Sequence, residues 1–574
     1  MTTFEILAGS VRRTGTATGA RSVTALPAEV PGVLRFEVVA DGPVTLQWTW
    51  PTGAAVTFWR ASQGARRELP TDWGSRRRIR SVRSAPVGSL VDDQDRSLLT
   101  VSLSAHVRGC EFAIGVNEET AEQLIELVAD DIESTSFVLR IDLRDVHFAE
   151  ALRGVTAEWT NDLGDRIAAV PEIARQPMYS TWYSDHQHVS AAAVEHHARA
   201  SAAYGCAAII VDDGWQTDST ARGYAYCGDW EPTSGKFPDM TEHVRRVHEL
   251  GLRYVLWIAP PLIGVHSKAW EQLKDRVLGF ADGEVVAVLD PRYPEVREHL
   301  VECCVRPVRD WGVDGLKIDF IDSWAWDGPV PDAPEADCTS IDEGVELLLQ
   351  AVRDALGDEV LIEFRQDYVN PRLWQFGTFL RAGDCAMDPV ENRVRTIDSR
   401  LLAGDRAVHS DMLMWHPSAT PETVAQQFIG ALFSTVQVSM ELESLPASHD
   451  AVVRYWLAFM REHFEVLQNG VLLPSRSDAR YAQVRAVGAT TVVAAFTNPV
   501  VQLASSDRSV VLVNGGGEPR LLVEGAGPGP IDLVVSDCSG AEVYRRTTTP
   551  PAGLWVVDVP TAGVARIDRL CINQ

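Results

Sequence analysis

Carboxylates recur where short apolar runs end in the middle of the chain, and basic residues stand close to them. They are the pair Asp212-Asp213, Asp319 with Lys317 just before it, and Asp384 with Arg381 just before it. Cleavage of a glycosidic bond requires one carboxylic acid that protonates the leaving oxygen and one carboxylate that attacks the anomeric carbon or activates water. A neighbouring lysine keeps such a carboxylate ionised. The pattern favours carbohydrate chemistry over hydroxyl or thiol nucleophiles.

Tryptophans and further polar side chains follow the same apolar runs. An indole face stacks on the apolar C–H face of a sugar ring. The candidates for substrate binding are Trp182, Trp257, Arg365 and Asp388, together with Asp212, Asp213, Lys317 and Arg381. For Arg365 the alternative is an ion pair with Glu363 or Asp367. For Asp212-Asp213 the alternative is a helix cap with Gly214 as the turn residue.

The elements that would position these residues alternate between strand and helix. Helical patterns such as 242–250 and 342–356 separate short apolar runs between residues 177 and 470, and Ser340 and Glu343 predict a capping box for the second of these helices. Strands are predicted at 178–183, 207–212, 254–259, 315–320, 361–365, 379–384, near 412–415 and at 436–442. Eight such units predict a (β/α)8 TIM barrel over 173–475, with its active site at the C-terminal ends of the strands.

Both flanks of the barrel have the pattern of β-structure. Val44, Leu46, Trp48 and Trp50 alternate with polar residues, and similar runs at 99–107 and 139–143 predict half-buried antiparallel strands. Apolar runs at 490–496, 509–513, 531–535 and 554–559 follow the barrel without helical patterns. We therefore expect an N-terminal β-sandwich over 1–172 and a small C-terminal antiparallel β-sandwich over 476–574.

Composition and charge exclude several classes of protein. The 574 residues are 45% hydrophobic and 23% charged, which is typical of a globular protein and not of a disordered one. The formal net charge of −27 disfavours nucleic acid and anionic membrane surfaces as partners. The expected partner is a small oligosaccharide or glycoside, and a homo-oligomer is left open.

Cysteine usage and the first residues predict the compartment. The nine cysteines show no CxxC spacing, which indicates reduced thiols in the cytoplasm and neither a disulfide framework nor structural zinc. Met1–Ser10 carries no basic segment and no long apolar run, so no signal peptide is expected. No membrane span is expected elsewhere.

Four segments together resemble a known family. They are Ser180-Thr-Trp182, Val211-Asp-Asp-Gly-Trp-Gln216, Val288-Leu-Asp-Pro291 with Asp314-Gly-Leu-Lys-Ile-Asp-Phe320, and Arg381-Ala-Gly-Asp-Cys-Ala-Met-Asp388. In this order, each at a strand end, they resemble glycoside hydrolase family 36, the α-galactosidases and their relatives in clan D. The predicted order of sandwich, barrel and sandwich also agrees with that family.

The resemblance implies a role for each matched residue. Asp319 would be the nucleophile of a retaining, exo-acting mechanism and Asp384 the general acid/base, about 5–5.5 Å apart. The pKa of Asp384 should then be raised by burial or by the charge of Asp319. Asp212, Asp213, Lys317 and Arg381 would line the donor subsite, Trp182 and Trp257 would form its walls, and Arg365 and Asp388 would contact substrate. No metal or organic cofactor is implied.

Two departures from the family leave the sugar open. The segment 363–367, Glu-Phe-Arg-Gln-Asp, replaces a Cys-Ser-Gly-Gly-type segment that helps to read the 2-position of the sugar, and Ala259 stands where many members place a glutamate before proline. An α-galactosidase is the first expectation. An α-N-acetylgalactosaminidase, a transglycosylase of raffinose-synthase type and an enzyme for another α-sugar are alternatives.

Two functions of other classes are also weighed. His186-Gln-His188 after the first strand is a feature of metal-dependent amidohydrolase barrels, with His409, Asp411 and His416 as conceivable further ligands. The strands between offer aspartate and arginine instead of histidine, which disfavours this hypothesis. A catalytically silent carbohydrate-binding protein is disfavoured because both carboxylates are present. In the long loop 323–339, Trp324 and Trp326 could bind an acceptor sugar or pack under the loop.

Overall fold

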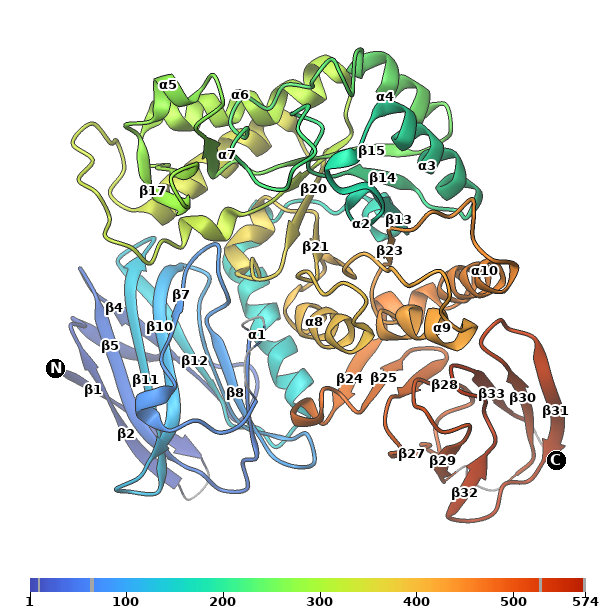
Figure 1. The fold of residues 1–574 in the computed structure, drawn as a ribbon. Helices are drawn as coiled ribbons and strands as arrows, with labels where there is room; N and C mark the ends of the chain where they lie inside the picture. Colours follow the sequence, from blue (N-terminus) through green and yellow to red (C-terminus); the bar gives the residue numbers. More distant parts are fainter. Residues whose placement is uncertain (9–10, 62–63, 65–66, 526–528, 571–574) are drawn as a thin grey trace.

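The computed structural model describes residues 1–574 except 9–10, 62–63, 65–66, 526–528 and 571–574. At its centre, eight parallel strands form one sheet in the order β22-β21-β20-β19-β15-β14-β13-β23 (Figure 1). Their bounds are β13 Met178–Ser180, β14 Ala208–Val211, β15 Arg253–Ile258, β19 Gly315–Ile318, β20 Leu361–Arg365, β21 Phe379–Arg381, β22 Ala407–His409 and β23 Gln437–Val438. A parallel bridge between His409 and Thr435 joins the two edges of this sheet. The predicted (β/α)8 barrel is confirmed.

The seventh strand was predicted at the wrong residues. It is β22, whereas the apolar run near 412–415 follows the strand and contains the buried residues Met412, Leu413 and Trp415. The run therefore marked burial and not strand conformation, although Leu413 makes an isolated parallel bridge with Val438. The first strand is also shorter than predicted, because Trp182 begins the short helix α2, Trp182–Asp185.

Helices cover the outside of the barrel in the order that the alternation predicts. They are α3 Ala191–Ala203, α4 Met240–His248, α6 Pro294–Trp311, α7 Ile341–Leu356, α8 Pro389–Leu402, α9 Pro421–Gly430 and α10 Ala447–Glu462, with the short α5 Trp270–Leu273. At the start of α7 the hydroxyl of Ser340 accepts the N–H of Glu343 at 3.1 Å, as the predicted capping box requires. The Glu343 carboxylate accepts the N–H of Thr339 at 3.0 Å, one residue before the position expected. A small sheet of β16 Leu262–Gly264, β18 Val286–Leu289 and β17 Val277–Asp282 follows β15.

Two six-stranded antiparallel sheets precede the barrel and form the predicted N-terminal sandwich. One contains β1 Thr2–Ala8, β2 Val11–Thr18, β5 Val44–Pro51, β11 Glu122–Ile132, β10 Val107–Asn117 and β7 Arg77–Ile79. The other contains β3 Ser22–Leu26, β4 Val33–Val39, β12 Ser136–Asp142, β9 Ser97–Leu103, β8 Val87–Val91 and β6 Thr57–Arg60. Trp48 and Trp50 are buried between the sheets. The run 99–107 is divided between β9 and β10, which belong to different sheets.

Helix α1, Phe148–Leu163, links the sandwich to the barrel. The indole of Trp159 donates to the carbonyl of Leu103 at 2.8 Å and meets the ring of Trp374 edge-on at 6.0 Å. The loop 323–339 makes a second link, because Arg83 pairs with Asp327 at 2.9 Å. Trp324 is buried beneath this loop and donates to the carbonyl of Leu289, so it packs under the loop.

The C-terminal β-structure consists of two sheets (Figure 1, red). One contains β24 Val471–Ser475, β25 Gln483–Val487, β26 Thr491–Ala495, β28 Ser509–Asn514, β33 Val564–Arg569, β30 Ile531–Ser536 and β31 Glu542–Thr548. The other contains β27 Val500–Gln502, β29 Leu521–Glu524 and β32 Leu554–Val557. Most pairs are antiparallel as predicted, but β26 with β28 and β27 with β29 are parallel. Because β24 belongs to this sheet, the C-terminal β-structure begins at Val471; the predicted domain limits at 172/173 and 475/476 stay predictions.

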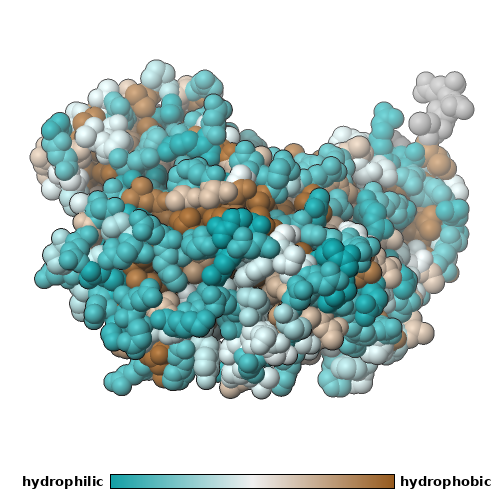
Figure 2. Space-filling view, turned by 90° about the horizontal axis from the view of Figure 1, so that it is seen from above, coloured by the Kyte–Doolittle hydropathy of each residue, from teal (hydrophilic) through white to brown (hydrophobic). Residues whose placement is uncertain are grey.

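The surface in Figure 2 is mostly hydrophilic and the described cysteines are unpaired, as the composition and the cysteine spacing predict. Seen from above, most of the surface is hydrophilic, with apolar residues gathered in a band across the middle of this face (Figure 2). The eight cysteines within the described residues are free thiols, and Cys571 lies outside those residues. Among the helices of the described residues, none is both long and apolar enough to cross a membrane.

Candidate active site

Asp319 lies directly after β19 and is held by donors on both carboxylate oxygens. Oδ2 accepts the indole N–H of Trp257 at 3.0 Å. Oδ1 accepts the backbone N–H of Phe320 at 2.7 Å and the hydroxyl of Tyr368 at 3.2 Å, and it forms an ion pair with Arg365. Phe320 adopts a left-handed backbone with φ of 58°, an uncommon conformation for a bulky residue. Asp319 is thus oriented by neighbouring strands and by the turn that follows its own.

The charges around Asp319 keep it ionised. Burial alone would raise its pKa, but the positive charges of Arg365, Lys317 and Arg381, with the Trp257 hydrogen bond, hold the pKa well below its usual range. The ion-pair partner of Arg365 is Asp319. A second carboxylate, Asp322, lies 3.9 Å from its Nη2. At neutral pH the carboxylate is a buried anion in a fixed orientation.

The Asp212-Asp213 pair lies beside Lys317 at the end of β14. Lys317 Nζ donates to Asp212 Oδ2 at 2.5 Å, and both side chains are buried. The two oxygens of Asp213 accept the side-chain amides of Gln187 and Gln216 at 2.8 and 2.7 Å. A helix cap accepts backbone N–H groups, whereas both aspartates here accept side-chain donors. The contacts therefore favour a site over a helix cap.

Gly214 explains why a glycine follows the two aspartates. Its φ is +112°, and a Cβ atom at this position would lie 2.8 Å from the Cα atom of Gln187. A side chain would therefore be strained by the backbone conformation and would collide with a backbone that cannot move freely. The close approach brings Gln187 within reach of Asp213.

Asp213 should make stability depend on pH. Burial raises its pKa to about 6, against about 3.9 for an unfolded aspartate. Because the folded state then holds the proton more tightly, ionisation costs up to about 3 kcal/mol of folding free energy as pH rises from about 4 to above 6. Asp213→Asn cannot ionise, so its Tm relative to the native chain should increase over this range in calorimetry. The exposed carboxylate Asp165, replaced by asparagine, is the control; a Tm difference for Asp213→Asn that stays constant with pH would contradict the expectation.

Arg381, at the end of β21, joins three carboxylates. Its buried guanidinium lies 2.6 Å from Asp411, 2.9 Å from Asp384 and 3.3 Å from Glu363. Asp411 also accepts the hydroxyl of Tyr183 at 2.9 Å. Sequence reasoning considered Asp411 only as a metal ligand and Glu363 only as a partner of Arg365. The position of Glu363 within β20 and of Asp411 just after β22 was a signal that could have found them.

Asp384 lies at the outer side of this group, with 60% of its side chain exposed. Burial and the charge of Asp319 would raise its pKa, but the charge of Arg381, helped by Lys317 and Arg365, lowers it below the usual value. The expectation of a raised pKa is therefore wrong. The physical cause of the lowered pKa is Arg381, which donates a hydrogen bond to Asp384. The resemblance implied only that Arg381 lines the sugar subsite.

The two predicted tryptophan walls differ in environment. Trp257 is buried, donates to Asp319 and stacks on Tyr224 at 6.3 Å. Trp182 is half-buried at the start of α2, and the guanidinium of Arg222 lies over its ring at 5.6 Å. Asp388 caps α8, accepting the N–H groups of Val390 and Glu391 at 3.0 and 2.9 Å. These contacts account for the residue as a helix cap.

The histidines of the amidohydrolase hypothesis do not form a metal-ligating group among the described residues. His409 donates Nε2–H to the Ala174 carbonyl at 2.6 Å, and its Nδ1 accepts the side-chain amide of Gln437 at 3.2 Å. His188 and His416 are exposed, and Asp411 bonds Arg381. The geometry removes the support for that hypothesis.

The comparisons with known proteins agree with the barrel. Residues 149–325 match the family model named Melibiase. The α-galactosidase of Escherichia coli is 26% identical over 184 residues, which are 30% of this chain and 25% of that protein. An A type blood α-D-galactosamine galactosaminidase of Flavonifractor plautii is 26% identical over 251 residues, 38% of this chain and 22% of that protein. The matched segments thus span about a quarter of the length of these curated relatives.

A solved structure extends the likeness to nearly the whole chain. The family 36 α-galactosidase AgaA from Geobacillus stearothermophilus superposes with a TM-score of 0.65 at 16% identity, covering 97% of this chain and 81% of that one. Variants of AgaA have been solved in complex with stachyose and with raffinose. The predicted resemblance to glycoside hydrolase family 36 is thereby confirmed: residues 149–325 match the Melibiase family model, and the chain has the fold of this family 36 α-galactosidase.

Proposed function

We propose that this chain is a retaining, exo-acting α-glycoside hydrolase that removes terminal α-galactosyl residues from small oligosaccharides or glycosides. The observation that carries the proposal is Asp319, a buried carboxylate kept ionised at the end of β19. Its Oδ1 accepts three donors, whereas Oδ2 accepts Trp257 alone. Oδ2 is therefore the oxygen that would attack the anomeric carbon.

In the first step Asp384 would protonate the leaving oxygen while Asp319 Oδ2 forms the glycosyl ester. A bound substrate would remove the exposed Asp384 carboxyl from water, and loss of water raises the pKa of a carboxyl group. In the second step Asp384 would deprotonate the water that cleaves the ester. The esterified Asp319 no longer carries the charge that raises the pKa of Asp384. The pKa of Asp384 would therefore fall at the step in which this residue must be ionised to act as the base.

The donor subsite would be built from residues around Asp319. Asp212 and Asp213 would accept hydroxyl groups of the sugar, Lys317 and Arg381 would hold the carboxylates, and Trp257 and Trp182 would provide apolar faces. The likeness to α-galactosidases and to proteins that bind stachyose and raffinose supports an α-galactosyl substrate. The galactosaminidase relative and the segment 363–367 keep an α-N-acetylgalactosaminide, and transfer in place of hydrolysis, as alternatives.

The stereochemistry of the product tests the mechanism. On an aryl α-galactoside, NMR during the first turnovers should show the α-anomer of the free sugar before mutarotation. A β-configured first product would contradict double displacement and favour direct attack by water. A panel of aryl α-glycosides that differ at the 2-position would identify the sugar, and sugar acceptors added to it would reveal transfer.

Arg365 should set the acidic limb of the pH profile. It supplies the largest charge that lowers the pKa of Asp319, so Arg365→Gln should raise that pKa. Because Asp319 must be ionised to attack, kcat/KM should then begin to fall at a higher pH as the solution is acidified. Arg365→Lys, which keeps the charge, is the matched control. Equal acidic limbs in both variants would contradict this role.

A further inference from the structure

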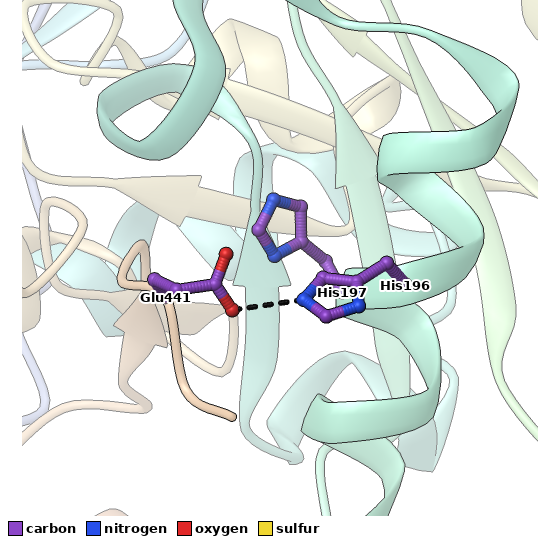
Figure 3. Close-up of side chains that lie close together, drawn as sticks. All are labelled: His196, His197 and Glu441. Atoms are coloured by element: carbon purple, nitrogen blue, oxygen red, sulfur yellow. Dashed lines mark hydrogen bonds and ion pairs between the residues drawn. The ribbon is translucent and has the colours of Figure 1, made fainter. Parts of the chain in front are cut away.

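A cluster of two histidines and a glutamate lies apart from Asp319, between helix α3 and the segment after β23 (Figure 3). His196 and His197 are neighbours on α3, and Glu441 follows β23. One ligand atom from each of the three residues lies within 4.8 Å of the others. It is the one group of this kind found in the described part of the chain.

His197 points an unused nitrogen into this cluster. Its side chain is 4% exposed, and its ring stacks on Tyr179 with centroids 5.1 Å apart. Nε2 lies 3.0 Å from the carboxylate of Asp185, whereas Nδ1 is buried and makes no hydrogen bond. A ring that donates Nε2–H to Asp185 carries its lone pair on Nδ1. A buried nitrogen lone pair without a donor is a costly arrangement unless a ligand occupies the space before it.

His196 is oriented in the same manner. Its Nδ1 lies 3.0 Å from Glu443, and its Nε2 lies 3.0 Å from Glu441. Each histidine therefore has a carboxylate behind one nitrogen and presents the other to the cluster. Metal-bound histidines almost always donate their second N–H to a carboxylate, a carbonyl or water, which fixes the tautomer and the ring. The arrangement is that of an orienting shell around a metal site.

We propose that His196 Nε2, His197 Nδ1 and a carboxylate oxygen of Glu441 bind one zinc ion, with water as the fourth ligand. Zinc at about 2.0–2.1 Å from tetrahedral ligands needs ligand atoms about 3.3 Å apart. The His196–Glu441 pair is already 3.0 Å apart, and the widest separation, 4.8 Å at most, closes by a shift of about 1.5 Å. The carboxylates of Asp185, Glu441 and Glu443 supply the negative charge that a dication requires.

The ion would join two segments at the mouth of the barrel. Asp185 ends α2, the helix that begins with Trp182, and the segment after β23 also supplies Ser439, whose hydroxyl accepts the N–H of Tyr183 at 2.9 Å. Zinc would therefore brace α2 and α3 against the chain that follows the eighth strand. It takes no part in the chemistry proposed at Asp319.

Metal titration of the untagged, chelator-treated chain tests the site. One equivalent of Zn²⁺ should bind in calorimetry and raise Tm, and Co²⁺ should give the intense visible bands of a four-coordinate ion. His196→Ala and Glu441→Gln should each weaken Zn²⁺ binding by about 100-fold or more, because each removes a ligand. Both side chains are partly exposed, so circular dichroism can verify that the variants fold. His266→Ala, an exposed histidine elsewhere, should leave Zn²⁺ binding unchanged.

Glu443→Gln separates orientation from ligation. The side chain does not ligate the ion in this proposal, and its loss should weaken Zn²⁺ binding by about 10- to 100-fold while the Co²⁺ spectrum keeps its four-coordinate form. Absence of a stoichiometric Zn²⁺ site in the native chain would overturn the proposal. Binding that survives His196→Ala at full affinity would do the same. Each of these readouts is independent of glycosidase activity.

Discussion

Replacement of Asp319 by alanine should lower kcat for aryl α-galactosides by at least about 10⁴-fold, because it removes the proposed nucleophile. Oδ2 of Asp319 is the oxygen with a single donor and would form the covalent bond. With a good leaving group, added azide should enter the vacated space and yield β-galactosyl azide, restoring part of the turnover. Product analysis by NMR would identify that azide.

Controls for this prediction come from the same turn. Asp322 lies 3.9 Å from Arg365 and carries no role in the proposed reaction, so Asp322→Ala should keep most of the activity. Asp319→Asn preserves the volume of the side chain and should be as inactive as the alanine variant. Unchanged turnover in either Asp319 variant would contradict the assignment of the nucleophile. A loss of turnover in Asp319→Ala that azide does not restore would also argue against Asp319 as the attacking group.

Asp384→Asn should separate substrates by their leaving groups. Loss of a general acid costs about 10²- to 10⁴-fold when the leaving oxygen needs a proton. An activated aryl group needs none, so the first step should persist and the ester on Asp319 should accumulate, because the base of the second step is also lost. Rapid quenching and mass spectrometry would detect the added sugar.

Asp388→Asn is the matched control for Asp384→Asn. Asp388 caps α8, and asparagine caps helices about as well as aspartate, so both activity and stability should change little. Equal losses on activated and unactivated substrates in Asp384→Asn would contradict its role as acid. A large loss of activity in Asp388→Asn would return that residue to the site.

The barrel and the residues around Asp319 could be predicted because local patterns carry them. Apolar runs alternate with helical faces, and polar residues close the runs, so the strand ends are visible in the sequence. β22 was missed because three residues, Ala407–His409, are too few to show a pattern. The apolar stretch after it is longer and buried, and burial alone does not distinguish strand from loop.

Contacts across the barrel could not be predicted from local patterns. Arg381 collects Glu363 and Asp411 from two neighbouring strands, and only the register of the parallel sheet brings these charges together. The same reason hides the histidine cluster, since Glu441 stands far from His196 in the chain. The expectation of no structural zinc rested on cysteine spacing, which carries no information about histidine and glutamate.

The guanidinium of Arg381 is hydrogen-bonded through both Nη atoms: Nη1 donates to Asp411 and to the Ala382 carbonyl, and Nη2 donates to Asp384. Its Nε faces Glu363 in an ion pair at 3.3 Å. The planar group cannot rotate without breaking a bond to Asp411 or to Asp384. Through Arg381, the position of the exposed Asp384 depends on the buried Asp411. Substitutions at Tyr183 or Asn392, which hold Asp411, should therefore change the position of Asp384 without any direct contact to it.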